Sequence, residues 1–139
     1  MRRPVLVDTS ALVALALTSD SKHSEAVSTL ADLRKKRTPL LSTTDVFDET
    51  VTLVRRWGGY AKAIEAGDLL RSSRMLELVR VNDDARDEAW RLFKEHQRPD
   101  LSFTDCTSAA IMEHLELSEV FAFDSDFRAF GFTQVPTPE

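Results

Sequence analysis

Short apolar segments alternate along this chain with helix-forming stretches, and this alternation restricts the folds open to it. The apolar segments span residues 5–7, 40–43, 76–81, 120–123 and 131–135. The stretches between them, most of ten or more residues, carry apolar side chains at the three- and four-residue spacing of a helix. Strands separated by such helices pair in parallel and are covered on both faces. The sequence therefore predicts an α/β fold, a three-layer α/β/α sandwich around a parallel sheet of four to five strands.

Cap and stop signals mark the predicted helices. Polar residues at 8–10 and at 82–84 are good helix N-caps, and the Gly58-Gly59 pair is a typical helix stop. Predicted helices span residues 11–17, 21–36, 45–57, 60–72 and 104–115, with one more between Asn82 and Pro99. No repeat or linker interrupts the pattern, and 139 residues have room for one hydrophobic core. We therefore expect a single domain over residues 1–139.

Charge and cysteine content narrow the class of protein. The chain has 18 Lys and Arg against 23 Asp and Glu, a net charge of −5. This argues against a general nucleic-acid coat but allows a local basic track beside an acidic pocket. A single cysteine, Cys106, excludes an intramolecular disulfide framework, so a reducing cytoplasm is expected. The longest apolar run, residues 11–17, is too short to cross a bilayer, so no membrane partner is expected.

Acidic residues follow the predicted strands, where parallel sheets bind their ligands. Asp8 ends the first strand, and Asp124 ends the fourth. Glu49 lies one turn into the helix after the second strand, and Asp105 begins the helix after the Pro99 loop. Each of these acids taken alone is explained by helix capping or by a turn. Their shared position at the strand ends makes the group informative.

Helical spacing and electrostatics sharpen this observation. Glu49 falls at the edge of an apolar helix face, and Asp105 lies above Ala109 and Met112 on a buried face. A buried acid is costly without a partner, and two carboxylates about 5 Å apart repel by roughly 3 kcal/mol at an effective dielectric of 20. Four such acids therefore need protons or a cation among them. Oxygen ligands favour Mg²⁺ or Mn²⁺, and such a cluster suits hydrolysis of phosphodiester bonds.

Four segments stand out in order along the chain: VLVDTSALVAL, STTDVFDETVTLVRR, LSFTDCTSAAIMEHLEL and VFAFDSDFRAFGF. Together they resemble PIN-domain nucleases, specifically the VapC-type toxin ribonucleases of bacterial toxin–antitoxin pairs. The resemblance covers nearly the whole chain and implies a PIN-like nuclease domain with metal-dependent endoribonuclease activity. The catalytic acids that it implies are Asp8, Glu49, Asp105 and Asp124.

The resemblance also implies supporting residues. The metal ligands that it implies are Asp8, Asp105, Asp124 and Asp126, with Mg²⁺ or Mn²⁺ as the ion. Thr9, Ser10 and Thr104 are the hydroxyl residues expected to support these acids. The family often has Ser or Thr two residues before the fourth acid, where this chain has Ala122.

Partners implied by the resemblance are an RNA substrate, a VapB-type antitoxin and a second copy of the chain in a homodimer. Arg55 and Arg56 follow Glu49 in sequence, and we expect at least one of them to hold RNA phosphates or an acidic partner segment. In the same region, five apolar or aromatic residues could form an interface, but core packing explains most of them: Phe47, Val51, Val54, Trp57 and Tyr60.

Two other functions fit the same residues. One is a phosphatase with Asp8 as nucleophile, although such enzymes commonly place a second acid where this chain has Ser10. The other is a non-catalytic, metal-binding interaction module, including a phosphoacceptor receiver. Receivers need a lysine just after a late strand, and the segment VFAFDSDFR has none.

Overall fold

Five parallel strands form the centre of the protein, whose computed structural model describes residues 2–138. The strands lie in the order β3-β2-β1-β4-β5, and every neighbouring pair is parallel. They are β1 (Val5–Val7), β2 (Leu40–Thr43), β3 (Leu76–Val79), β4 (Glu119–Phe121) and β5 (Thr133–Val135). The helices are α1 (Thr9–Ala16), α2 (His23–Lys35), α3 (Thr44–Gly58), α4 (Tyr60–Ser72), α5 (Asp83–Glu95), α6 (Phe103–His114) and the 3-10 helix η1 (Asp126–Phe130).

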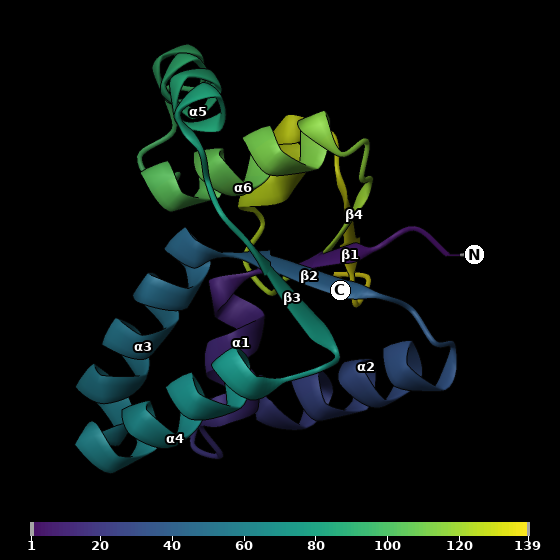
Figure 1. The fold of residues 1–139 in the computed structure, drawn as a ribbon, viewed down its shortest axis with the longest axis vertical. Coiled ribbons are helices and arrows are strands. Elements are labelled where there is room, and N and C mark those ends of the chain that lie inside the picture. The colour runs from purple at the N-terminus through teal and green to yellow at the C-terminus, as the bar shows by residue number, and fades with distance from the viewer. Residues whose placement is uncertain (1, 139) are drawn as a thin grey trace.

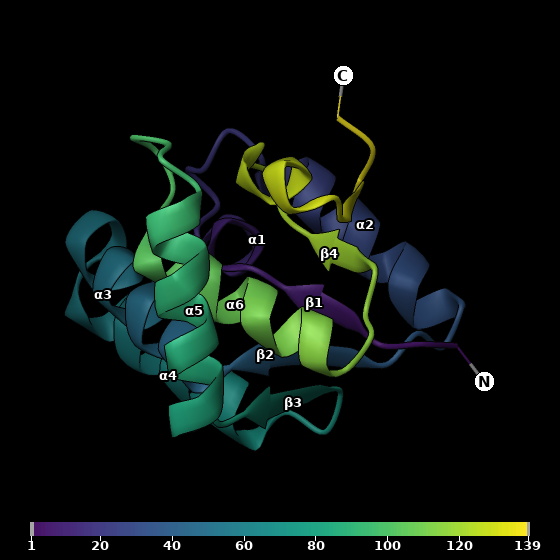
Figure 2. The same ribbon diagram turned by 90° about the horizontal axis from the view of Figure 1, so that it is seen from above.

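Helices cover both faces of this sheet. Figure 1 shows α5 and α6 on one face and α1, α2 and α4 on the other, and Figure 2 shows the sheet between them from above. The predicted three-layer α/β/α sandwich with a parallel sheet of four to five strands is thus confirmed. Within the described residues, none of the helices has the length and apolar character needed to span a membrane.

The central strand explains why the strand sequences are almost continuously apolar. All three residues of β1 are buried. Val5 and Val7 pack with Phe121 on the side of α1 and α2, whereas Leu6 packs with Met112 on the side of α6. Because successive side chains point to opposite faces, a strand covered on both sides has no polar position.

Element boundaries agree with the predicted ones to within a few residues. The largest differences are of two residues: α1 begins earlier than predicted, α2 and β5 begin later, and β3 and β4 end earlier. At the end of β4, the backbone N–H of Phe123 donates to the hydroxyl of Ser10 instead of to a neighbouring strand. The 3-10 helix η1 was not predicted, since five residues are too few for a helical period to be visible.

The turn between α3 and α4 carries two of the five residues named as interface candidates. Trp57 and Tyr60 are 61% and 63% exposed, so core packing does not explain them. Both lie at this turn, where Gly59 adopts a φ of +91°, a conformation that favours glycine. In Figure 1 the α3–α4 pair projects beyond the sheet. Apolar residues at helical spacing near this turn therefore have no sheet to cover them.

Candidate functional site

The change in strand order brings two acidic segments together. The chain passes from β1 to β2 on one side, and β4 lies on the other side of β1. Val7 pairs with Phe121 at the ends of these two strands. Asp8 follows β1 directly, and Asp124 follows β4 after two residues. Ligand sites of open parallel sheets lie at such a position, beyond the carboxyl ends of the strands.

The third acid comes from the start of α6. Ser102 is the N-cap of this helix, and its hydroxyl accepts a hydrogen bond from the backbone N–H of Asp105 at 3.0 Å. One carboxylate oxygen of Asp105, Oδ2, accepts from the backbone N–H of Ser102 at 3.0 Å. This reciprocal capping box fixes the side chain, and Oδ1 is the oxygen that it does not use.

Asp8, Asp105 and Asp124 form a compact acidic group. One carboxylate oxygen from each lies within 4.8 Å of the other two. Asp8 is 1% exposed and Asp105 is 6% exposed. At 4.8 Å and an effective dielectric of 20, each pair of charges repels by about 3.5 kcal/mol. The three carboxylates therefore require protons or a cation to stay together.

The pKa values of all three acids respond to this environment. Burial raises the pKa of Asp8 well above its ordinary value, and the carboxylates of Asp124 and Asp105 raise it further. Burial likewise raises the pKa of Asp105 to about 6, against the opposing effect of its hydrogen bonds from Ser102. The pKa of Asp124 is also raised, mainly by burial. Without a cation, this group holds protons more tightly than exposed acids do.

Ser10 is the hydroxyl residue that supports Asp8. Its hydroxyl donates to Asp8 Oδ2 at 2.8 Å and accepts from the backbone N–H of Phe123 at 3.0 Å. Its own backbone N–H also donates to Asp8 Oδ2, at 3.2 Å. Thr9 is buried, and its hydroxyl has no hydrogen-bond partner within residues 2–138. Ser10 thus joins the start of α1 to the end of β4 and orients Asp8.

The other oxygen of Asp8 tests whether these residues suit a metal ion. Asp8 Oδ1 is buried and has no hydrogen-bond partner in the described part of the chain. A buried oxygen left in this state costs about 1–3 kcal/mol, and more when it is charged. A cation among the three carboxylates would satisfy it. The donor set is oxygen only, which fits Mg²⁺ or Mn²⁺ rather than a softer metal.

Two other predicted acids lie next to this group but not in it. Asp126, in η1, is 6% exposed, and burial raises its pKa to about 7, with the carboxylate of Asp124 adding to the effect. Its backbone N–H lies 3.4 Å from Asp124 Oδ1. Glu49 is half-buried on α3 and lies close enough to Asp105 to raise the pKa of that acid, as a smaller effect than burial.

Glu49 lines an open cleft of about 520 Å³. The cleft lies between α3, the start of α5 and the start of α6. Its lining comprises Asp45, Asp48, Glu49, Thr52, Leu53, Arg86, Phe103 and Thr104. Thr104, the third predicted hydroxyl residue, is therefore on the cleft wall, next in sequence to Asp105. Arg86 and Ser102 are the residues of this region that the sequence analysis did not identify.

The predicted basic residues lie farther along α3. Arg55 and Arg56 are exposed in its last turn, about 9 Å and about 10.5 Å along the helix axis from Glu49 at 1.5 Å per residue. The guanidinium carbon of Arg55 lies 5.1 Å from the centre of the Tyr60 ring. The structure therefore places both arginines near the exposed turn between α3 and α4.

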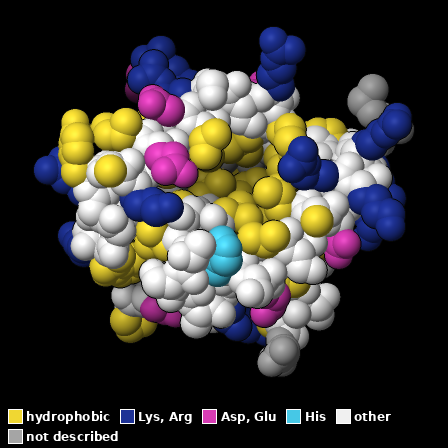
Figure 3. Space-filling model, turned by 90° about the horizontal axis from the view of Figure 1, so that it is seen from below, with side chains coloured by type: hydrophobic (Ala, Val, Ile, Leu, Met, Phe, Trp, Pro, Cys, Tyr) yellow, Lys and Arg dark blue, Asp and Glu magenta, His cyan; other side chains and the backbone are white. Residues whose placement is uncertain are grey.

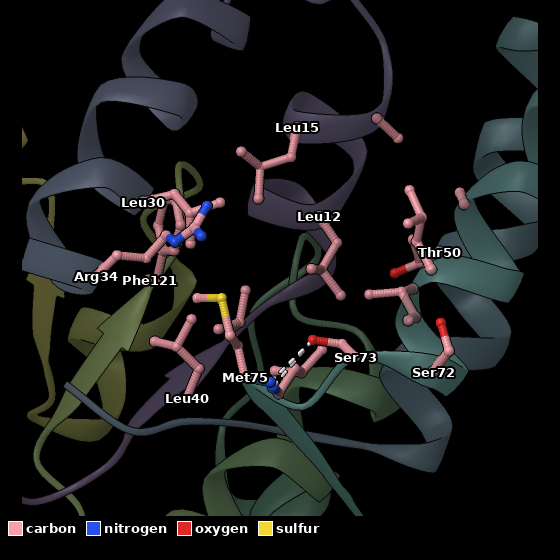
Figure 4. A pocket seen from close by; sticks show the side chains of 16 residues that line it. Leu12, Leu15, Leu30, Arg34, Leu40, Thr50, Ser72, Ser73, Met75 and Phe121 are labelled. Carbon is pink, nitrogen blue, oxygen red and sulfur yellow. Dashed lines mark hydrogen bonds between the residues drawn. The ribbon is translucent and has the colours of Figure 1, made fainter. Parts of the chain in front are cut away.

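A second hollow lies on the sheet face that α1, α2 and α4 cover. It has a volume of about 470 Å³ and is lined mainly by apolar side chains from these helices and from the strands beneath them. Figure 3 shows its hydrophobic floor with Lys and Arg side chains around part of the rim, and Figure 4 shows Leu12, Leu30 and Met75 facing into it. Arg34 lies at its edge and also lines an adjoining hollow with Arg37 and Arg74. We call the hollow of about 470 Å³ the apolar groove.

Comparisons with known proteins agree on one family. The model of the PIN domain matches residues 5–133. The chain is 33% identical over 132 residues to the 23S rRNA-specific endonuclease VapC20 of Mycobacterium tuberculosis, a match covering 94% of this chain and 97% of that protein. The crystal structure of that VapC20, a Sarcin-Ricin loop cleaving toxin, matches with a TM-score of 0.82 and 32% identity, over 92% of this chain and 95% of that chain. VapBC2 from Rickettsia felis, solved with a DNA fragment from its promoter, shares the fold, with a TM-score of 0.69 and 15% identity over 94% and 96% of the two chains.

Proposed function

The chain belongs to the PIN-domain family. We propose that it is a metal-dependent endoribonuclease, the toxin of a VapC-type toxin–antitoxin pair. The observation that carries the proposal is the buried group of Asp8, Asp105 and Asp124 at the point where the strand order changes direction. Three carboxylates held within 4.8 Å of one another repel each other and destabilise the folded protein unless a cation is bound. A divalent cation bound there would support cleavage of a phosphodiester bond, which explains why such a group is present.

Asp8, Asp105 and Asp124 would hold the ion in this proposal. When bound, Mg²⁺ or Mn²⁺ would neutralise these acids and stabilise the negative charge that develops on the phosphate during hydrolysis. Ser10 keeps Asp8 oriented through two hydrogen bonds to Oδ2, which leaves Oδ1 for the ion. The capping box plays the same part for Asp105.

Glu49 and Asp126 are proposed as the acids that flank the reacting phosphate. Glu49 lines the open cleft, so its carboxylate can meet water and accept a proton. Asp126 is buried next to Asp124, and we propose that it contacts the ion directly or through water. Arg55 and Arg56 are exposed on α3 and are proposed to hold phosphates of the RNA farther from the cut.

RNA is the proposed substrate because the VapC20 relative is a 23S rRNA-specific endonuclease and matches 94% of this chain. The activity would take place in the cytoplasm, where such RNA and a reducing environment for Cys106 are both found. The second copy expected in a homodimer stays part of the proposal. Light scattering on the purified protein would test it.

The apolar groove is the proposed docking site for the antitoxin. Its apolar lining suits the apolar face of a partner helix. Arg34 at its edge, with Arg37 and Arg74 in the adjoining hollow, suits acidic residues flanking that face. On α4, Leu69 lines the groove, whereas Ile64 is exposed outside it. A small DNA-binding protein encoded beside this gene should co-purify with the Ile64→Glu variant and not with Leu69→Glu.

Cleavage of purified RNA with and without a chelator tests the proposed activity. We expect new RNA ends in Mg²⁺ or Mn²⁺, none in chelator, and a loss of at least a hundredfold in the Asp8→Asn variant, with Asp68→Asn on the exposed side of α4 as the matched control. Scission that survives Asp8→Asn would reject the site. A phosphorylated Asp8 after incubation with a phosphodonor would favour the phosphatase, and metal binding without scission would favour the interaction module.

A further inference from the structure

Arg86 is held in a defined position at the cleft beside the acidic group. Its Nη1 donates to Asp45 Oδ2 at 2.9 Å, and its guanidinium carbon lies 5.4 Å from the centre of the Phe103 ring. The side chain is still 47% exposed. A planar cation that is fixed by an ion pair and by one aromatic contact has lost most of its freedom before any ligand arrives. Its exposed part is therefore ready for a flat partner.

The aromatic residue beneath Arg86 is itself fixed. Phe103 makes edge contacts with Trp90 and Phe93 of α5, with ring centres 6.2 Å and 6.0 Å apart. Trp90 and Phe93 stack on each other at 5.7 Å. Because Phe103 precedes Asp105 by two residues on α6, this aromatic cluster holds Arg86 at a constant distance from the acidic group.

The rest of the cleft wall is rich in hydrogen-bond acceptors. Asp48 and Glu49 contribute carboxylates, and Thr52 and Thr104 contribute hydroxyls. In the absence of a cation such a wall repels a phosphate, which disfavours the RNA backbone as its ligand. It accepts N–H donors, and a guanine base offers two of them, N1–H and N2–H, side by side for one carboxylate.

We propose that this cleft binds a nucleobase of the RNA next to the cut, stacked on the guanidinium plane of Arg86, with Asp48 accepting its N–H groups. Guanine is the base that the wall fits best. Single-stranded RNA is read by stacking on arginine planes and by hydrogen bonds to base edges. The inference rests on the proposed ribonuclease function and adds to it the residue that selects the base.

A second copy of the chain could also occupy the cleft, but the charged residues that line the cleft disfavour it. The centres of protein interfaces are depleted in charged residues, whereas this cleft carries three carboxylates and one guanidinium among eight lining residues. The cleft also opens beside Asp105 through Thr104 and Glu49, so a base placed there has its phosphate close to the acidic group.

The Arg86→Lys variant tests the proposal because lysine keeps the charge for Asp45 and lacks the plane. Arg91→Lys is the matched control, since Arg91 is exposed on the same helix, pairs with Glu88 and Glu95, and does not line the cleft. Binding would be measured by fluorescence anisotropy in chelator, with a uridine 12-mer and the same 12-mer carrying one central guanosine. Wild type should prefer the guanosine oligomer, and Arg86→Lys should bind it about fivefold to fiftyfold more weakly and lose the preference. Arg91→Lys should match wild type.

Cleavage in Mg²⁺ and light scattering, run on the same three proteins, separate the possible failures. Wild type that cuts RNA, together with an Arg86→Lys variant that keeps both affinity and base preference, would overturn this inference alone. Wild type that cuts no RNA would overturn the proposed function and this inference with it. An Arg86→Lys variant that changes the mass of the assembly, with RNA affinity unchanged, would assign the cleft to a second copy and also overturn the inference.

Discussion

Replacing Asp105 with Asn should make the metal-free protein more stable at neutral pH, although it removes a residue of the proposed site. Burial raises the pKa of Asp105 from 3.8 to about 6. The folded protein therefore keeps this proton between those two pH values, while the unfolded chain has lost it. The contribution of Asp105 to the free energy of unfolding therefore falls as the pH rises from 3.8 to about 6, and this loss is complete above about pH 6.

The size of the effect follows from the same pKa values. A rise from 3.8 to about 6 corresponds to about 3 kcal/mol of destabilisation at pH 7.5. Asparagine removes this cost, and its side-chain oxygen can still accept from the backbone N–H of Ser102. The substitution also removes a negative charge from the start of α6, which costs about 0.5–1 kcal/mol and offsets part of this gain. The net gain is about 2 kcal/mol, or roughly 6–8 °C in Tm for a chain of this size.

Thermal and urea unfolding in chelator would measure this gain. Wild type, Asp105→Asn and the exposed control Asp68→Asn would be compared at pH 7.5 and at pH 4.5. At pH 4.5 the cost of the Asp105 carboxylate falls to about 1 kcal/mol, so the advantage of the variant should shrink by more than half. Asp68→Asn should unfold within about 0.5 kcal/mol of wild type at both pH values. An Asp105→Asn variant no more stable than wild type at pH 7.5, or a gain independent of pH, would show that the buried Asp105 carboxylate does not destabilise the fold.

Three further changes have defined outcomes. Asp8→Asn should abolish the rise in Tm that Mn²⁺ gives wild type. In wild type this stabilisation should be about 2.7 kcal/mol at one hundred times the Kd, measured by calorimetry. An equal rise in Tm in both proteins would contradict the site. Ser10→Ala removes the hydroxyl that joins Asp8 to the Phe123 N–H, and should cost about 1 kcal/mol in urea unfolding and lower the cleavage rate; unchanged values in both would count against its role. Thr50→Val replaces a buried hydroxyl that has no hydrogen-bond partner in residues 2–138, and should stabilise the protein by about 1 kcal/mol without changing cleavage. Destabilisation of that variant would show that the hydroxyl is satisfied.

The fold was predictable because its signals are periodic. Strands buried on both faces are continuously apolar, helices repeat every three to four residues, and Gly59 stops α3 where a positive φ is needed. The exposure of Trp57 and Tyr60 was not predictable in this way. Periodicity identifies the apolar face of a helix, but it does not say how far the helix extends beyond the sheet that would cover that face.

The candidate site was predictable in part for the same reason. Residues that end neighbouring parallel strands meet at one edge, so Asp8 and Asp124 could be placed together from sequence. The capping box of Ser102 with Asp105 also has a local signal, an S-x-x-D spacing at a helix start. Arg86 has none, because its partner Asp45 is 41 residues away in the chain and the contact depends on how α6 packs against both α5 and α3.

The most direct test of the cation site is a crystal structure of the protein grown with Mn²⁺, with anomalous scattering used to locate the ion. We expect one strong anomalous peak bonded to carboxylate oxygens of Asp8, Asp105 and Asp124, at about 2.0–2.3 Å, and no such peak in crystals of Asp8→Asn. Wild-type crystals in millimolar Mn²⁺ that show no peak among these three acids, or a peak held by other residues, would contradict this expectation.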